Sequence, residues 1–115
     1  MNKRQLGNTN INLTAIGFGG APLGNLFENL DERNCYDILE KTYNEGINIY
    51  DTSPLYGYGL SEHRLGNFLK TVDEESYFLS TKVGRYLTPA KKESIDRGRF
   101  AGSLNFSPNL DYSYD

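Results

Sequence analysis

The sequence predicts an α/β fold in which short parallel strands alternate with amphipathic helices. Two stretches with apolar residues at helical spacing separate three short apolar runs, and turn-forming residues bound each run. This alternation is typical of parallel strands whose connecting helices pack on the outside of the sheet. Two further short runs on either side of a turn predict a β-hairpin ahead of the first parallel strand.

The composition fits one small domain and excludes several classes of protein. Of 115 residues, 37% are apolar and 23% are charged, as in an ordinary globular protein. The net charge of -3 gives no basic surface for nucleic acid, and no apolar run approaches the length of a membrane helix. The single Cys35 allows no internal disulfide, and the N-terminus lacks the apolar segment of a signal peptide, so we expect a cytoplasmic location.

The hairpin is expected over residues 3–14. Its strands are Lys3–Leu6 and Ile11–Thr14, and four turn formers between them make the connection. A short buried strand is expected next, over residues 15–19. It leads into Gly19, Gly20 and Ala21, whose small side chains let a ligand approach the backbone.

The first helix is predicted to begin after Asp31, which can cap its N-terminus. Gly46 stands where a helix commonly ends, and residues 47–50 form the second expected strand. The apolar stripe of this helix consists of Cys35, Ile38, Leu39, Thr42 and Tyr43. Because Cys35 lies on that stripe, we interpret it as a buried structural thiol rather than a nucleophile.

A second helix is expected after Ser61, which can serve as its N-cap. Its predicted stripe consists of Leu65, Phe68, Leu69 and Val72. The only histidine, His63, lies off this stripe and is expected to face solvent, so the sequence indicates no metal site. Residues 77–81 form the third strand, which leads into Lys82.

Residues from 84 onward have a different character. They show no clear helical period after residue 88, and a short extended piece is possible at Phe100–Phe106. Long loops of this kind are usually functional or disordered. Because the segment follows the strand that leads to Lys82, both a lid over a pocket and a frayed tail remain open.

Three chemical groups follow the three predicted parallel strands: a glycine pair, Asp51 with Tyr56, and Lys82. The carboxyl ends of parallel strands face one side of the sheet, where ligands bind, so these groups should converge. A free phenol has a pKa of about 10, and a nearby ammonium favours the phenolate. The trio could thus exchange a proton with a carbonyl or alcohol, while a cofactor would have to supply the hydride.

Each residue also has a simpler interpretation. Asp51 could cap a turn, Tyr56 could be one of many aromatic residues at the rim, and Lys82 could be solvated. Lys82 could instead form a Schiff base, as in barrel aldolases. The joint placement of all three at strand ends favours the proton-handling unit.

These residues identify a resemblance to the aldo-keto reductases. The similar stretches are residues 13–20, 48–57, 61–66 and 79–84. The resemblance implies a (β/α)₈ barrel with a hairpin at its base. It also implies that Tyr56 is the general acid and base, that Lys82 assists it, and that Asp51 pairs with Lys82. The tail is similar to that of the branch containing D-threo-aldose 1-dehydrogenase, L-fucose dehydrogenase and pyridoxal 4-dehydrogenase.

The resemblance further implies NADP or NAD as cofactor, bound near Gly19, Gly20, Ala21 and Asp51, and a small aldehyde, ketone or sugar as substrate. The family's fourth catalytic residue, a histidine on the fourth strand, has no counterpart here, since His63 does not match it. We therefore expect a partial domain over residues 1–115: a hairpin at 3–14, the first three β/α units at 15–83 and a loop at 84–115. It would be a truncated reductase with little activity alone, or a non-catalytic interaction module.

Overall fold

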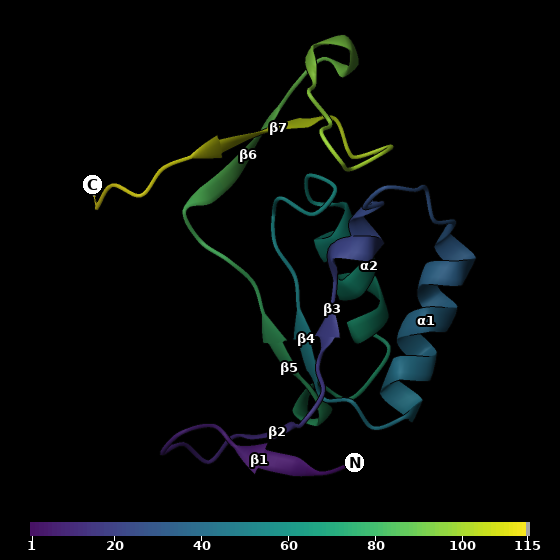
Figure 1. Cartoon of the computed structure of the whole chain (residues 1–115), viewed down its shortest axis with the longest axis vertical. Coiled ribbons are helices and arrows are strands. Elements are labelled where there is room, and N and C mark those ends of the chain that lie inside the picture. Colours follow the sequence, from purple (N-terminus) through teal and green to yellow (C-terminus); the bar gives the residue numbers. More distant parts are fainter. Residues whose placement is uncertain (115) are drawn as a thin grey trace.

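The computed structural model describes residues 1–114. They form a three-stranded parallel sheet with two α-helices on one side, a hairpin at one end of the sheet and a longer antiparallel arm at the other (Figure 1). The elements in chain order are β1 Lys3–Gln5, β2 Asn12–Thr14, β3 Phe18–Gly19, η1 Ala21–Gly24, α1 Glu32–Asn44, β4 Ile49–Asp51, α2 Leu60–Leu69, η2 Glu74–Ser76, β5 Phe78–Ser80, β6 Arg85–Pro89, η3 Lys92–Ser94 and β7 Phe106–Leu110.

The parallel sheet has the order β3-β4-β5, which confirms the predicted α/β class. Gly19 of β3 lies opposite Asp51 of β4, and Asp51 lies opposite Ser80 of β5. The strands are short, and Ile16 lies outside β3 with an exposed side chain, although a buried strand over residues 15–19 was expected. The register nevertheless brings the carboxyl ends of all three strands to one edge.

The core lies between the sheet and the two helices. It consists of Leu23, Cys35, Leu39, Tyr50, Leu65, Phe68 and Leu69. Asp31 caps α1 as predicted, since its carboxylate accepts a hydrogen bond from the Asn34 amide. Cys35 is buried as expected, but Ile38 is 42% exposed, because the helix turns only a narrow stripe toward the sheet.

The start of α2 differs from the prediction. The helix begins at Leu60, with Gly59 as its N-cap, so Ser61 lies inside the first turn and caps nothing. Its side chain is fully buried and points into the protein. His63 is exposed, as the sequence predicted. No helix among residues 1–114 is long and apolar enough to span a bilayer.

The N-terminal hairpin pairs β1 with β2, as predicted. The buried Asn48 fixes it to the parallel sheet, because its side-chain oxygen accepts from the Thr14 amide and its side-chain nitrogen donates to the Asn12 carbonyl. The hairpin therefore lies at the amino ends of the parallel strands, opposite the edge that carries Asp51 and Lys82 (Figure 1).

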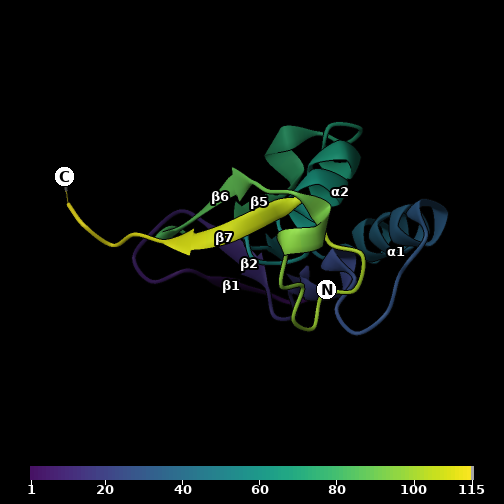
Figure 2. The same ribbon diagram turned by 90° about the horizontal axis from the view of Figure 1, so that it is seen from above.

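Residues after Gly84 form an antiparallel arm, where the sequence showed no clear helical period and suggested only a short extended piece. β6 pairs with β7 over five residue pairs, from Arg85 opposite Leu110 to Pro89 opposite Phe106. The predicted extended piece at Phe100–Phe106 is wrong, since only Phe106 belongs to a strand. Within residues 1–114, no α-helix follows β5, only the short 3₁₀ helix η3. From above, the arm lies across the end of the parallel sheet (Figure 2).

Candidate active site

Asp51 ends β4 and lies at the carboxyl edge of the sheet. Its carboxylate accepts hydrogen bonds from the Ser80 hydroxyl at 3.0 Å and from Lys82 Nζ at 3.0 and 2.8 Å. The bond from the Lys82 ammonium lowers the pKa of the Asp51 carboxyl below its usual value. Asp51 is therefore an ionised acceptor, held by groups from the neighbouring strand.

Lys82 follows β5 and bridges the other two members of the predicted trio. Its Nζ also donates to the Thr52 carbonyl oxygen at 2.8 Å, and it lies 5.3 Å from the centre of the Tyr56 ring. The hydrogen bond with Asp51 raises the pKa of Lys82 above its usual value. The structure thus brings together Asp51, Tyr56 and Lys82, as their positions after successive parallel strands predicted.

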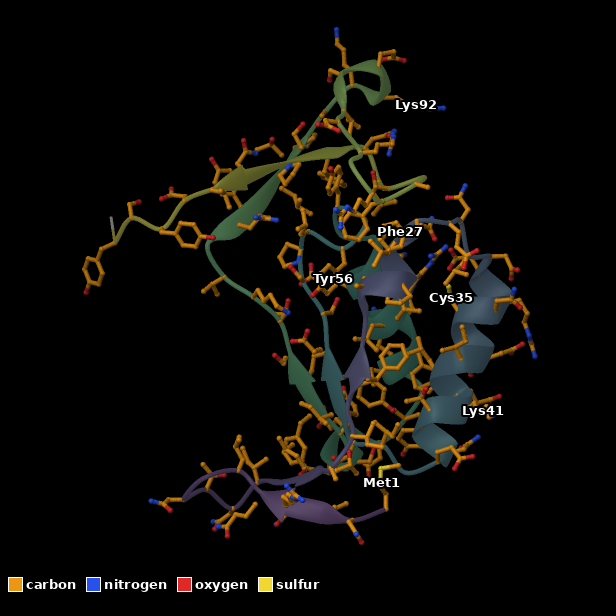
Figure 3. All side chains as sticks on the ribbon, in the orientation of Figure 1. Met1, Phe27, Cys35, Lys41, Tyr56 and Lys92 are labelled. Atoms are coloured by element: carbon orange, nitrogen blue, oxygen red, sulfur yellow. The ribbon has the colours of Figure 1, made fainter. Side chains whose placement is uncertain are left out.

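Tyr56 lies in a tight turn between β4 and α2, close to the ends of the strands (Figure 3). The turn is fixed from both sides, since the Tyr56 amide donates to the Ser53 carbonyl and the Tyr56 carbonyl accepts from the Ser61 amide. Its ring packs against Phe100 of the arm, with 6.1 Å between ring centres. The backbone and the arm together set the direction of the phenol.

Two glycines let this turn pack against the 3₁₀ helix η1. A Cβ at Gly24 would lie 2.4 Å from the Tyr56 carbonyl carbon and 2.5 Å from the Gly57 nitrogen. A Cβ at Gly57, where φ is +67°, would lie 2.5 Å from the Gly24 carbonyl oxygen. Only glycine at both positions permits this backbone contact, because neither backbone can yield without moving Tyr56.

The three residues predicted to meet a cofactor have different surroundings. Gly19 is exposed, and a Cβ there would meet no heavy atom within 4 Å. Gly20 is buried, its amide donates to the Asp51 carbonyl oxygen, and a Cβ would lie 2.8 Å from that oxygen. Packing therefore accounts for Gly20, whereas Gly19 is exposed and Ala21 is half-buried.

Ser61 connects the ends of two strands from inside α2. Its hydroxyl donates to the Gly20 carbonyl oxygen at 2.7 Å and lies 2.9 Å from the Thr52 hydroxyl. All three residues are buried. This short polar chain fixes the loop after β3 relative to the loop after β4, and so fixes Gly19 relative to Asp51.

Arg64, one turn later in α2, organises the connection between β3 and α1. Its guanidinium donates to the carbonyl oxygens of Leu23 and Leu30, to the side chain of Asn25 and to Glu32. The Arg64 side chain is only 6% exposed. A planar group with five donors suits this role, because one side chain meets acceptors in several directions.

A shallow pocket of about 230 Å³ lies beside Tyr56 and Lys82. Its remaining lining residues are Ser53, Leu55, Val83, Arg85 and Tyr112. The last two come from the arm, which therefore contributes to the wall of the site. The arm stands at the side of this pocket, and the interpretation of residues from 84 onward as a lid stays a prediction.

The strand-end carboxylate, lysine and tyrosine agree with what comparison of the sequence finds. Residues 15–107 match the Aldo/keto reductase family. The chain belongs to the aldo/keto reductase family. This confirms the resemblance that the motifs around Asp51 and Lys82 indicated.

The family relatives include several dehydrogenases. Pyridoxal 4-dehydrogenase of Microbacterium luteolum is 42% identical over 98% of this chain, and D-threo-aldose 1-dehydrogenase of a Pseudomonas species is 47% identical over 67%. L-Galactose dehydrogenase of Arabidopsis thaliana is 44% identical over 81%. The chain spans 35%, 23% and 28% of the length of these three relatives.

Solved aldo/keto reductase structures agree in fold. A glycerol dehydrogenase from Gluconobacter oxydans superimposes with a TM-score of 0.66 at 20% identity, covering 95% of this chain and 30% of the other. A holo aldo-keto reductase from Bacillus halodurans gives 0.65 at 33% identity, covering 84% and 29%. Residues 1–114 therefore correspond to part of an aldo/keto reductase barrel, and they form three of its parallel strands without closing it.

The sequence did not single out Gly24, Arg64 or the buried role of Ser61. A signal was present for two of them, since Ser61 and Arg64 lie at helical spacing from Leu65 and Phe68, on the buried stripe. A polar residue on such a stripe must find partners inside the protein. Gly24 carried no such signal, because its contact with Gly57 joins segments that are distant in sequence.

Proposed function

We propose that this chain carries the proton-transfer part of an NAD(P)-dependent oxidoreductase that interconverts a small carbonyl compound, an aldehyde or a sugar, with its alcohol or lactone. The observation that carries the proposal is the position of Lys82, which is hydrogen-bonded to Asp51 and faces the Tyr56 ring. The names of the dehydrogenase relatives support the reaction class.

Tyr56 is the proton donor and acceptor in this proposal. A carbonyl oxygen placed against its hydroxyl would accept the phenol proton as the carbonyl carbon is reduced, and the reverse reaction would return the proton. The Lys82 ammonium stabilises the negative charge that develops on the phenol oxygen. Asp51 keeps that ammonium charged and oriented. The hydrogen bonds of Lys82 Nζ to both carboxylate oxygens of Asp51 and to the Thr52 carbonyl support this role.

A nicotinamide cofactor would supply the hydride. The exposure of Gly19 supports such a partner, because this residue lies opposite Asp51 in the sheet and a Cβ there would meet no heavy atom within 4 Å. Ala21, two residues later, is half-buried. Gly20 contributes indirectly, since its bond to the Asp51 carbonyl holds the loop at the edge of the sheet.

The Schiff-base alternative finds no support in this geometry. An amine that attacks a carbonyl must be neutral, which requires a lowered pKa. The hydrogen bond to Asp51 raises the pKa of Lys82 instead. The second alternative, a non-catalytic interaction module, is separated from the enzyme by the experiment below.

The test is cofactor-dependent turnover with a matched tyrosine variant. Oxidation of D-threo-aldoses and of pyridoxal would be followed at 340 nm with NAD⁺ and with NADP⁺. The enzymes compared are the wild-type chain, Tyr56→Phe and, as a matched control, Tyr36→Phe, whose ring packs on Phe68 between α1 and α2. We expect weak turnover, because the chain spans only part of its relatives, and we expect Tyr56→Phe to lower it by at least about a hundredfold while Tyr36→Phe leaves it unchanged. Turnover that survives Tyr56→Phe contradicts the proposal, and a wild-type chain that neither turns over nor binds cofactor favours the interaction module.

A further inference from the structure

The pocket beside Tyr56 contains an arginine that has no partner in the described part of the chain. Arg85 opens β6 and is half-buried in the pocket wall. No ion pair or side-chain hydrogen bond holds its guanidinium within residues 1–114. Arg64 and Arg97 behave differently, since each of them donates to several acceptors.

The charge around this pocket is unbalanced. Lys82 is neutralised by Asp51, with which it forms an ion pair. Asp111, at the end of β7, accepts hydrogen bonds from the backbone and side chain of Ser113 and does not pair with Arg85. The lining residues include no acid, so Arg85 leaves the pocket with one uncompensated positive charge.

An aromatic ring stands on the same side of the pocket. Tyr112 packs against the backbone of Gly84, where φ is +84° and a Cβ would lie 1.9 Å from the tyrosine Cε1. The Asp111 amide donates to the Gly84 carbonyl, which fixes the start of the tail at this point. The Tyr112 side chain is 75% exposed, so it offers a free apolar surface beside Arg85.

From this juxtaposition we propose that the pocket selects a sugar-like carbonyl substrate that carries an oxyanion, either a carboxylate or a phosphate. Arg85 pairs with the oxyanion, because a guanidinium binds carboxylate and phosphate through two parallel hydrogen bonds. Tyr112 packs against the apolar face of the sugar ring, which directs the reacting carbon toward Tyr56. The proposal rests on the proposed function for the role of Tyr56 as proton donor and acceptor. The oxyanion site itself is testable without turnover.

The experiment measures binding to the uniformly ¹⁵N-labelled chain by NMR titration, without cofactor. The probes are D-galactose, D-galacturonate and D-galactose 6-phosphate, which differ at C6. NADP⁺ is titrated separately to represent a cofactor phosphate. The variants are Arg85→Gln, Tyr112→Ala and, as a matched control, Arg99→Gln. Arg99 is an exposed arginine of the arm that does not line this pocket, and its guanidinium lies over the Phe27 ring.

We expect the wild-type chain to bind at least one charged sugar about tenfold or more tightly than galactose, because hydrogen bonds to charged groups are the strong ones. Arg85→Gln should abolish that preference, Arg99→Gln should retain it, and Tyr112→Ala should weaken all three sugars together. Tighter binding of D-galacturonate would identify the oxyanion as a carboxylate, and tighter binding of D-galactose 6-phosphate would identify it as a phosphate.

Three results would overturn the proposal. Equal affinity for charged and neutral sugars, or no binding of any, removes the oxyanion site. A preference that persists in Arg85→Gln assigns it to another cation. Arg85-dependent binding of NADP⁺ with no Arg85 effect on the sugars assigns the arginine to the cofactor. None of these results depends on catalysis, so they leave the test of Tyr56 by turnover unaffected.

Discussion

At the scale of single residues, buried polar side chains decide how the strand ends are held. Ser61 and Arg64 both project from α2 toward the connection that follows β3, and both satisfy carbonyl oxygens there. No buried side-chain nitrogen or oxygen within the described residues lacks a partner. Removing one of these side chains would leave its acceptors buried and unsatisfied, which is costly in a low-dielectric interior.

Replacing Arg64 with leucine should therefore lower the free energy of unfolding by about 1–3 kcal/mol or more, since several acceptors lose their donor. Urea denaturation followed by circular dichroism would measure this change. The matched control is Arg33→Leu, because Arg33 is 80% exposed and forms a surface ion pair with Asp37. That change should alter stability by less than about 0.5 kcal/mol. Equal effects of the two substitutions would contradict the role assigned to Arg64.

Tyr50 should make the free energy of unfolding depend on pH in the alkaline range. It is completely buried, and burial raises the pKa of its hydroxyl to about 12. The unfolded chain loses this proton near pH 10, before the folded chain does, so stability is full below about pH 10 and falls as pH rises toward 12. A shift of two units corresponds to a loss of up to about 3 kcal/mol.

Measurement of unfolding free energy from pH 9 to 12 would reveal this loss. Tyr50→Phe removes the titrating hydroxyl and its hydrogen bond to the Ile47 carbonyl, so the variant should show a shallower decline over the same range. A decline of equal steepness in the variant would show that Tyr50 does not cause it.

At the scale of elements, the turn that carries Tyr56 depends on its contact with η1. The backbones of Gly24 and Gly57 approach so closely that a methyl group at either position would collide with main-chain atoms. Close backbone packing of this kind fixes the position of a turn more firmly than side-chain contacts, because no rotamer change can relieve the collision.

Gly24→Ala should accordingly destabilise the protein by about 1–3 kcal/mol and displace Tyr56. Denaturant unfolding would give the first quantity, and the amide shifts of residues 56 and 57 in a ¹H–¹⁵N spectrum would report the second. Gly66→Ala is the matched control, because a Cβ at Gly66 in α2 meets nothing within 4 Å. This control should raise stability by about 0.5–1 kcal/mol, since alanine is the better helix former. Destabilisation by both changes would point to a general intolerance of alanine.

At the scale of the whole molecule, a few contacts join the arm to the turn that carries Tyr56. The Phe100 ring packs on Tyr56 and Tyr58, the Leu104 amide donates to the Gly57 carbonyl, and the Tyr58 hydroxyl donates to the Asp96 carbonyl. The loop after η1 also holds the arm, since the Phe27 amide donates to the Arg99 carbonyl and Leu26 forms an antiparallel bridge with Phe100. Beyond these contacts the arm extends away from the parallel sheet, with Lys92 at its far end (Figure 3). Its orientation therefore depends on Phe100 and its neighbours.

Phe100→Ala should release the arm from the turn while leaving the parallel sheet intact. Hydrogen exchange would show faster exchange of the Leu104 amide, and the Thr52 amide, which donates to Ser80 within the sheet region, should keep its protection. Tyr86→Ala serves as the control, since Tyr86 is 50% exposed on β6. Faster exchange of both amides in Phe100→Ala would mean that the arm and the sheet unfold as one unit.

The sequence by itself determined the order of strands and helices and the meeting of Asp51, Tyr56 and Lys82. Apolar periodicity defines each element locally, and parallel strands necessarily present their carboxyl ends on one side. These inferences need no knowledge of long-range contacts. The family was indicated separately, by the resemblance of residues 13–20, 48–57, 61–66 and 79–84 to the aldo-keto reductases.

Only the tertiary structure decided what surrounds that chemistry. In the structure, Ser61 is a buried bridge between two loops and not the predicted helix cap. Residues 85–89 pair with 106–110, and Gly24 packs on Gly57. Each of these features joins segments with no local pattern that predicts the contact. The physical reason is that hydrogen bonds and close packing between distant segments depend on the full arrangement of the chain, whereas periodicity records only which face of an element is buried.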